Sequence, residues 1–282
     1  MKLGSIIICI LLMAVGPLPL SSCRSESPPR DVEPVEESES PSETESDGES
    51  ESPPETDPDE GGVFIEPFSE PVKLTPALEA TLQKDEEGRP VVTNPASILV
   101  LVNKNRNLPA DYEPDDLVQP DVPFPFAGDM PRKLLRPEAA SALEELVESA
   151  EKEELDIYAS SGYRSYSTQR NIFEYNARTR GEEEANRFSA RPGQSEHQTG
   201  LAMDVTCPEV GFELIQRFGE TEEGRWIKDN AHRFGFIIRY PEGAEGITGY
   251  AYEPWHLRYV GQHHAERIHE LGVTFEEYMQ GR

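Results

Sequence analysis

Cysteine is scarce in this chain of 282 residues, which contains only Cys9, Cys23 and Cys207. Three cysteines cannot build a disulfide framework or a metal site made of cysteine ligands. Basic residues are also few, with 26 lysines and arginines against 54 acidic residues and a net charge of −28. Because binding to phosphates and anionic lipid headgroups relies on lysine and arginine, we expect no nucleic-acid partner and repulsion from an anionic membrane surface.

Hydrophobic residues make up only 36% of the chain, which indicates that part of it lacks a core. Residues 24–60 contain 15 acidic residues, two arginines and no aromatic residue, and most other positions are Ser or Pro. Such a segment cannot bury enough apolar surface to offset its conformational entropy. We therefore predict an acidic disordered tether over residues 23–62, followed by an arm of uncertain order over residues 63–93.

The N-terminal apolar run, residues 6–15, is too short to span a bilayer and follows a basic residue, Lys2. This order predicts a secretory signal peptide over residues 1–22. The signal ends in Leu20-Ser21-Ser22-Cys23, which resembles the bacterial lipobox and implies a diacylglycerol anchor on Cys23. We expect the protein on the extracytoplasmic face of the cell membrane, facing the cell wall. The alternative is an ordinary signal peptide with an incidental cysteine.

Residues 94–282 mix short apolar runs with stretches of helical periodicity and show no regular βαβ repeat, which favours one α+β domain. A proline in the first turn and apolar residues at helical spacing predict a helix that opens at Pro137. Further helices are predicted at 166–180, 222–234 and 262–271, and strands at 97–102, 156–160, 201–206, 236–240 and 250–260. A capping box opens a last short helix at Thr274.

A helical zinc site needs two histidines four residues apart, and none of the six histidines has such a partner. We interpret four of them as ordinary helix residues: His232, His263, His264 and His269. In contrast, His197 lies in a loop before a predicted strand that carries Asp204. Alternation along that strand assigns one face to the core residues Leu201, Met203 and Val205. The opposite face would turn Asp204 toward His197, and such a pair can supply two ligands to a tetrahedral metal.

A second group of residues is Glu253-Pro254-Trp255-His256. In a regular strand Glu253 and His256 would face opposite ways, but Pro254 favours an edge or a bulge, which could bring both to one site. His256 would complete a set of three metal ligands and leave the fourth position for water, as in catalytic zinc sites. Glu253 would then be the general base.

Four segments together identify a family resemblance. They are residues 195–204, residues 253–256, Ser161-Gly162-Tyr163-Arg164-Ser165 with Gln169, and Leu108-Pro109-Ala110-Asp111-Tyr112. In this order and spacing they resemble the VanY-type D-alanyl-D-alanine carboxypeptidases, over residues 94–271. The resemblance implies a single compact zinc-peptidase domain, with a small antiparallel sheet flanked by helices, as in hedgehog and VanX-like proteins.

The resemblance also implies roles for individual residues. Zn²⁺ would be bound by His197, Asp204 and His256. Glu253 would be the general base, and Arg164 would lie against the scissile carbonyl oxygen. Gln169 and Ser195 would hold the terminal peptide and carboxylate of the substrate, although Ser195 could instead only cap its loop.

The implied reaction is removal of the C-terminal D-alanine from peptidoglycan stem peptides by attack of a zinc-activated water. We expect the D-Ala-D-Ala end of the pentapeptide as substrate. The LD-bond at the end of the tetrapeptide is the main alternative, since related LD-carboxypeptidases have the same ligand set, and an endopeptidase is a further one. A non-catalytic wall-binding lipoprotein is the alternative of another class, and it would be expected to lose Glu253 or a zinc ligand. A transporter's solute-binding lipoprotein would need two larger lobes and has no reason for the Glu253–His256 run. We expect stem peptides as partners and a monomeric chain.

Overall fold

The computed structural model describes residues 78–281. The predicted signal peptide, Cys23 and the tether lie outside the described residues, as do residues 63–77 of the arm. Within residues 78–281, no helix has the length and apolar character needed to cross a membrane.

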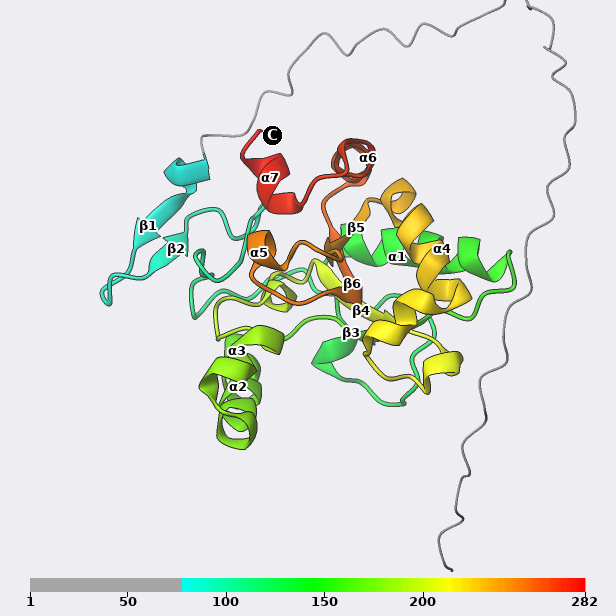
Figure 1. The fold of residues 1–282 in the computed structure, drawn as a ribbon, viewed down its shortest axis with the longest axis horizontal. Coiled ribbons are helices and arrows are strands. Elements are labelled where there is room, and N and C mark those ends of the chain that lie inside the picture. The colour runs from blue at the N-terminus through cyan, green and yellow to red at the C-terminus, as the bar shows by residue number, and fades with distance from the viewer. Residues whose placement is uncertain (1–77, 282) are drawn as a thin grey trace, which may run out of the picture. The chain divides into compact units, whose positions relative to one another are not determined.

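The fold is built on a four-stranded sheet with the order β3-β4-β6-β5, in which every neighbouring pair is antiparallel. The strands are β3 (Tyr158–Ser161), β4 (Ala202–Thr206), β5 (Phe236–Tyr240) and β6 (Glu253–Tyr259). Figure 1 shows helices on the flanks of this sheet, which include α1 (Pro137–Glu151), α4 (Glu222–Asn230), α6 (Gln262–Leu271) and α7 (Phe275–Met279). The predicted α+β class is confirmed.

Local capping explains where several helices begin. Pro137 occupies the first turn of α1, where its missing N–H costs nothing. Helix α2 (Tyr166–Arg180) begins after Ser165, whose hydroxyl accepts a hydrogen bond from the backbone N–H of Thr168. Thr274 forms the predicted capping box at the start of α7. These signals are local, and the predicted bounds of α2 and α6 match the structure.

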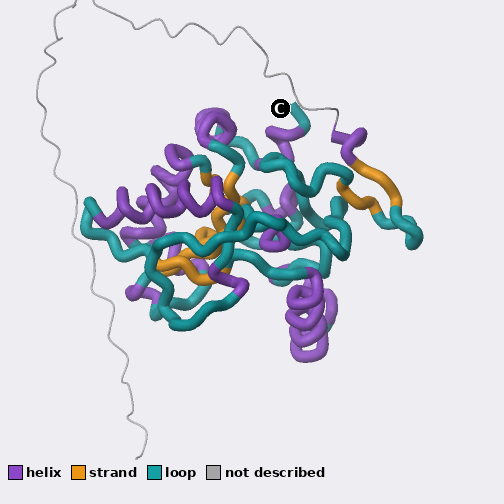
Figure 2. Tube along the Cα trace, turned by 180° about the vertical axis from the view of Figure 1, so that it is seen from behind, coloured by secondary structure: helices purple, strands orange, loops and turns teal. Residues whose placement is uncertain are grey.

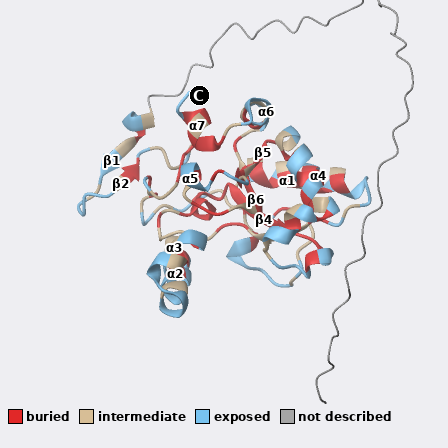
Figure 3. Cartoon of the chain, viewed as in Figure 1, coloured by how far each residue is buried: buried red, intermediate tan, exposed pale blue. Residues whose placement is uncertain are grey.

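The main core lies between α1 and one face of β4. Leu201, Met203 and Val205 are fully buried there, as alternation along the strand predicted, and they share one apolar cluster with Leu143 and Leu146 of α1. The opposite face of β4 is also covered, because every residue of the strand is buried. Figure 3 shows the buried residues concentrated around β4 and β6. Asp204 is therefore a carboxylate in the interior, which requires charged or polar partners.

The prediction of a strand at residues 97–102 is wrong. Val100, Leu101 and Val102 are buried as expected, but the segment forms turns. The backbone carbonyls of this segment bind a buried arginine of β6 and not a neighbouring strand. The Arg258 guanidinium donates to the carbonyls of Ile98 and Val100 at 2.8 and 2.9 Å. Backbone acceptors satisfied in this way need no sheet partner.

Two smaller units lie beside the sheet. Residues 78–93 of the arm contain the hairpin of β1 (Leu82–Lys84) and β2 (Pro90–Val92), and Val92 packs in one cluster with Val100, Val102 and Leu108. Helix α2 pairs with α3 (Glu182–Phe188), which the sequence analysis did not predict, and both extend away from the sheet in Figure 1 and, seen from behind, in Figure 2. A short helix, α5 (Glu245–Thr248), precedes β6.

Candidate active site

A cavity of about 260 Å³ lies above β4 and β6, between the 3-10 helix Glu196–Thr199 and helix α2. The structure brings to it all seven residues that the sequence analysis assigned to catalysis, metal binding or substrate binding: Arg164, Gln169, Ser195, His197, Asp204, Glu253 and His256. These seven side chains come from four separate stretches of sequence, residues 164–169, residues 195–197, Asp204 and residues 253–256, which the fold brings together.

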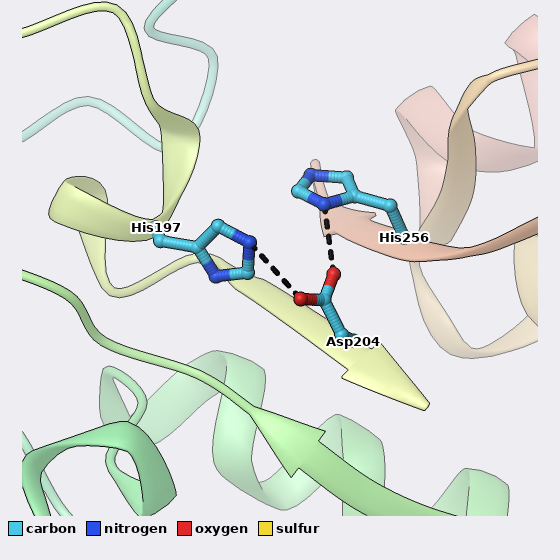
Figure 4. Close-up of side chains that lie close together, drawn as sticks. All are labelled: His197, Asp204 and His256. Atoms are coloured by element: carbon cyan, nitrogen blue, oxygen red, sulfur yellow. Dashed lines mark hydrogen bonds and ion pairs between the residues drawn. The ribbon is translucent and has the colours of Figure 1, made fainter. Parts of the chain in front are cut away.

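Two structural devices place the two histidines and the aspartate. Gly200 ends the 3-10 helix in the left-handed region, at φ 69°, and a Cβ there would meet the Leu117 side chain at 2.8 Å. This turn carries the chain from His197 into β4. In the antiparallel pair of β4 and β6, Asp204 then lies directly opposite His256. Figure 4 shows the carboxylate of Asp204 between the two imidazole rings.

The donor atoms of these three residues all lie within 4.8 Å of one another. The Nδ1 atom of His197 is 2.8 Å from the Gly162 carbonyl, which can only accept, so Nδ1 carries the hydrogen. Burial lowers the pKa of His197, which favours the neutral ring and leaves a lone pair on Nε2. That lone pair faces the Oδ2 atom of Asp204 at 3.3 Å. Two atoms that can only accept, here His197 Nε2 and Asp204 Oδ2, lie this close together when a cation binds both. The buried set of two imidazoles and one carboxylate suits zinc.

His256 and Asp204 form a second contact, at 2.9 Å between Nδ1 and Oδ1. Burial alone would lower the pKa of His256, but the carboxylates of Asp204 and Glu196 raise it to about 9. Burial would raise the pKa of the Asp204 carboxyl, but His197 and His256 hold it well below its usual range. Asp204 is therefore an anion throughout the physiological range and attracts cations to this site.

Glu253 reaches the same site because the pairing of β5 with β6 is irregular. Ile238 pairs with Leu257, but Tyr240 pairs with Glu253, so three residues of β6 lie opposite one residue of β5. This bulge contains Pro254 and brings Glu253 Oε2 to 3.9 Å from His256 Nδ1. Burial raises the pKa of the Glu253 carboxyl to about 7. A carboxylate poised near neutrality beside a metal site is suited to general-base chemistry.

Arg164 also lines the cavity. Its guanidinium donates to Gln169 Oε1 at 2.9 Å and to Ser161 Oγ at 3.0 Å, and it lies 4.0 Å from Asp204 Oδ2. Gln169 is held in turn by a hydrogen bond from its Nε2 to the carbonyl of Ala190. Ser195 is buried on the cavity wall, and its side chain does not cap the 3-10 helix that follows.

Several further residues line this site that the sequence did not predict. Tyr240 and Tyr250 line the cavity with ring centroids 4.8 Å apart, and burial raises the pKa of both phenols. Trp255 packs against the core and also lines the cavity. Glu196 also lines the cavity, and its Oε2 lies 3.7 Å from His256 Nε2. No local pattern identifies these residues, because each reaches the site from its place in the fold.

Comparison with known proteins extends these observations. The family model for VanY, described as D-alanyl-D-alanine carboxypeptidase, matches residues 132–262. The putative carboxypeptidase YodJ of Bacillus subtilis (strain 168) is 49% identical over 197 residues, which cover 70% of this chain and 72% of YodJ.

Two solved structures are also similar to this chain. The structure of the LdcB LD-carboxypeptidase has a TM-score of 0.69 and 48% sequence identity, and the match covers 71% of this chain and 93% of LdcB. A D,D-pentapeptidase VanY mutant from a VanB-type resistance cassette, solved in complex with Zn(II), has a TM-score of 0.53 and 33% identity, over 64% of this chain and 98% of that protein. The chain thus belongs to the VanY-type D-alanyl-D-alanine carboxypeptidase family, and it is a zinc metallopeptidase.

Proposed function

We propose that this protein removes the C-terminal D-alanine from peptidoglycan stem peptides and that zinc is bound by His197, Asp204 and His256. The observation that carries the proposal is the buried cluster of these three donors, with Glu253 beside it at the wall of an accessible cavity. A wall-binding protein without catalysis would have no need for a carboxyl whose pKa burial raises to about 7 at this position.

The residues of the cavity have different roles in amide hydrolysis. A zinc ion supplies a Lewis acid that polarises a carbonyl and makes water more acidic. Glu253 accepts a proton from the attacking water and returns it to the departing D-alanine nitrogen. Water adds to the carbonyl carbon, the C–N bond breaks, and the products are free D-alanine and the shortened peptide.

Arg164 supports the charge that develops on the carbonyl oxygen. Its guanidinium is permanently charged, and the hydrogen bonds to Gln169 and Ser161 fix its orientation at the cavity wall. Preorganised donors of this kind stabilise an oxyanion without reorganisation during the reaction. Ser195 lies on the same wall and can donate to the carboxylate or the terminal peptide of the substrate.

Within this reaction, we favour the LD-bond of the tetrapeptide over the D-Ala-D-Ala bond that the sequence alone suggested. The support is the LdcB LD-carboxypeptidase, whose structure is more similar to this chain than that of the D,D-pentapeptidase, by TM-score and by identity. D-Ala-D-Ala remains the second candidate, because the family model is described by that activity.

The substrate can be identified by incubating the protein separately with stem tetrapeptide and pentapeptide, with and without a chelator, and weighing the products. We expect the tetrapeptide to lose one D-alanine, and we expect the chelator to prevent the loss. Shortening of the pentapeptide alone would assign the D-Ala-D-Ala bond instead. If neither peptide shortens while zinc stays bound, the protein is an endopeptidase on cross-linked wall or a binding module.

We propose further that Cys23 carries the lipid anchor and that the monomeric domain stands off the membrane on the acidic tether. The support is the Leu-Ser-Ser-Cys run at the end of the apolar segment. In a bacterial host, labelled fatty acid should be incorporated into the wild-type chain and into a Cys9→Ser control, but not into Cys23→Ser. Label in Cys23→Ser would disprove the anchor.

A further inference from the structure

A cluster of four charged side chains lies beside His256, and one of them, Glu196, also lines the cavity. Arg239 and Arg258 are fully buried, the Glu196 side chain is fully buried, and Glu276 is 4% exposed. The two carboxylates and two guanidinium groups balance in charge. Buried charges without partners are costly, so such a cluster persists only where its geometry is well satisfied.

The hydrogen bonds of this cluster connect α7 to the site through Arg239. Arg239 donates from Nη1 and Nη2 to the two oxygens of Glu276, at 2.8 and 2.6 Å, and from Nε to Glu196 Oε1 at 2.8 Å. Arg258 donates to the same Oε1, also at 2.8 Å. Both arginines therefore engage one oxygen of Glu196 and leave the other, Oε2, pointing elsewhere.

The second oxygen of Glu196 faces His256. Glu196 Oε2 and His256 Nε2 lie 3.7 Å apart, both atoms are buried, and neither has a hydrogen-bond partner within residues 78–281. Leaving two buried polar atoms unsatisfied is expensive, and here each is the natural partner of the other. A small rotation of the ring or the carboxylate converts the contact into a hydrogen bond.

We propose that Glu196 is a positioning residue for the metal ligand His256 and that Glu276 of α7, through Arg239, holds Glu196 in place. This inference rests on the proposed function in one respect, the assignment of His256 as a ligand. The Nδ1 atom faces the metal cluster, so it must present a lone pair, and the ring hydrogen must sit on Nε2. A carboxylate that accepts from Nε2 selects that tautomer and fixes the ring plane.

The consequence is that the C-terminal helix supports the metal site. Helix α7 lies beyond residues 132–262, the part of the chain matched by the family model. Glu276 touches neither the cavity nor the metal ligands, and it acts on them only through Arg239 and Glu196.

The test is the zinc dissociation constant of the full chain, measured by competition with a chromophoric chelator. In Glu196→Gln the two arginines hold the amide oxygen, so the amide NH₂ faces His256 Nε2 and selects the wrong tautomer. We expect zinc to bind about 10- to 100-fold more weakly, the range found for outer-shell partners. Glu276→Gln should weaken zinc binding several-fold. The matched control is Glu277→Gln, which removes the neighbouring charge of α7, keeps an oxygen that can accept in the capping box and leaves the contacts of Arg239 intact, and it should bind zinc like the wild type.

A second variant covers the case in which the single variants do not fold. Arg239→Met combined with Glu276→Leu removes a positive and a negative charge together, which proteins tolerate better than the loss of one partner. We expect this variant to bind zinc more weakly, and the visible absorption of bound Co²⁺ to change, because the ligand geometry is altered. A purely structural ion pair would change only the melting temperature.

The positioning role of Glu196 is overturned if folded Glu196→Gln binds zinc within twofold of the wild type, and the support from α7 is overturned if the folded double variant and Glu276→Gln both do. Failure of the proposed function is a different result. In that case His256→Ala would leave zinc binding unchanged, or the wild-type chain would bind no zinc at all.

Discussion

Asp204→Asn is expected to have no measurable peptidase activity. It should also bind zinc more than about 100-fold more weakly than the wild type, a larger loss of affinity than outer-shell substitutions cause. Asp204 is the centre of the cluster, with Oδ1 at 2.9 Å from His256 and Oδ2 at 3.3 Å from His197. An asparagine removes the negative charge and replaces one acceptor with an NH₂ group. That group donates to a histidine lone pair that the metal requires.

The measurement is zinc content after dialysis against a weak chelator, together with D-alanine release at saturating zinc. The matched control is Thr206→Val, on the same strand and the same face as Asp204, where the residue is also buried. This control removes a hydrogen bond to the Glu213 carbonyl but should retain zinc. Wild-type zinc content in Asp204→Asn would show that the cluster is not the metal site.

Glu253→Gln is expected to lower kcat by about 10²- to 10⁴-fold, the range that general acid–base catalysis contributes. Zinc should still bind, because the three ligands remain in place. The amide cannot accept the proton of water, so the loss should appear in kcat and not in the zinc dissociation constant. Activity within tenfold of the wild type would exclude Glu253 as the base.

The same substitution should stabilise the metal-free protein. This gain in stability would also show that the variant is folded. The Glu253 carboxyl has a pKa of about 7 in the fold against an ordinary value of 4.5. Between these values the folded state binds the additional proton, so the stability contribution of this group falls as pH rises through that window. At pH 8 the variant should gain up to about 3 kcal/mol in the free energy of unfolding, and at pH 4 almost nothing. An equal effect at both pH values in thermal melts would contradict the shifted pKa.

The elements that local signals define could be predicted from the sequence. Ser165 and Pro137 mark the starts of helices, and alternation along β4 separates Met203 in the core from Asp204 at the site. The ligands and catalytic residues of the cavity could be predicted because their sequence segments resemble those of a known family. The irregularity expected at Pro254 is present as a bulge.

What could not be predicted depends on contacts between distant segments. The apolar run 97–102 has the composition of a strand, but its carbonyls bind Arg258, which is some 160 residues away. Helix α3 carries an N-terminal signal that could have revealed it, namely three acidic residues in its first turn. Glu196 carries no such signal, because its importance comes from Arg239, Arg258 and His256, all supplied by β5 and β6.

The antiparallel pairing of β4 with β6 couples zinc to the folding equilibrium. Asp204 and His256 are 52 positions apart along the chain and become neighbours only when these two strands pair. The unfolded chain therefore offers no preformed site, and zinc binds almost exclusively to the native state. By mass action, each tenfold rise in free zinc above the dissociation constant adds about 1.4 kcal/mol to the free energy of unfolding. The concentration of free zinc thus sets the fraction of this enzyme that is folded.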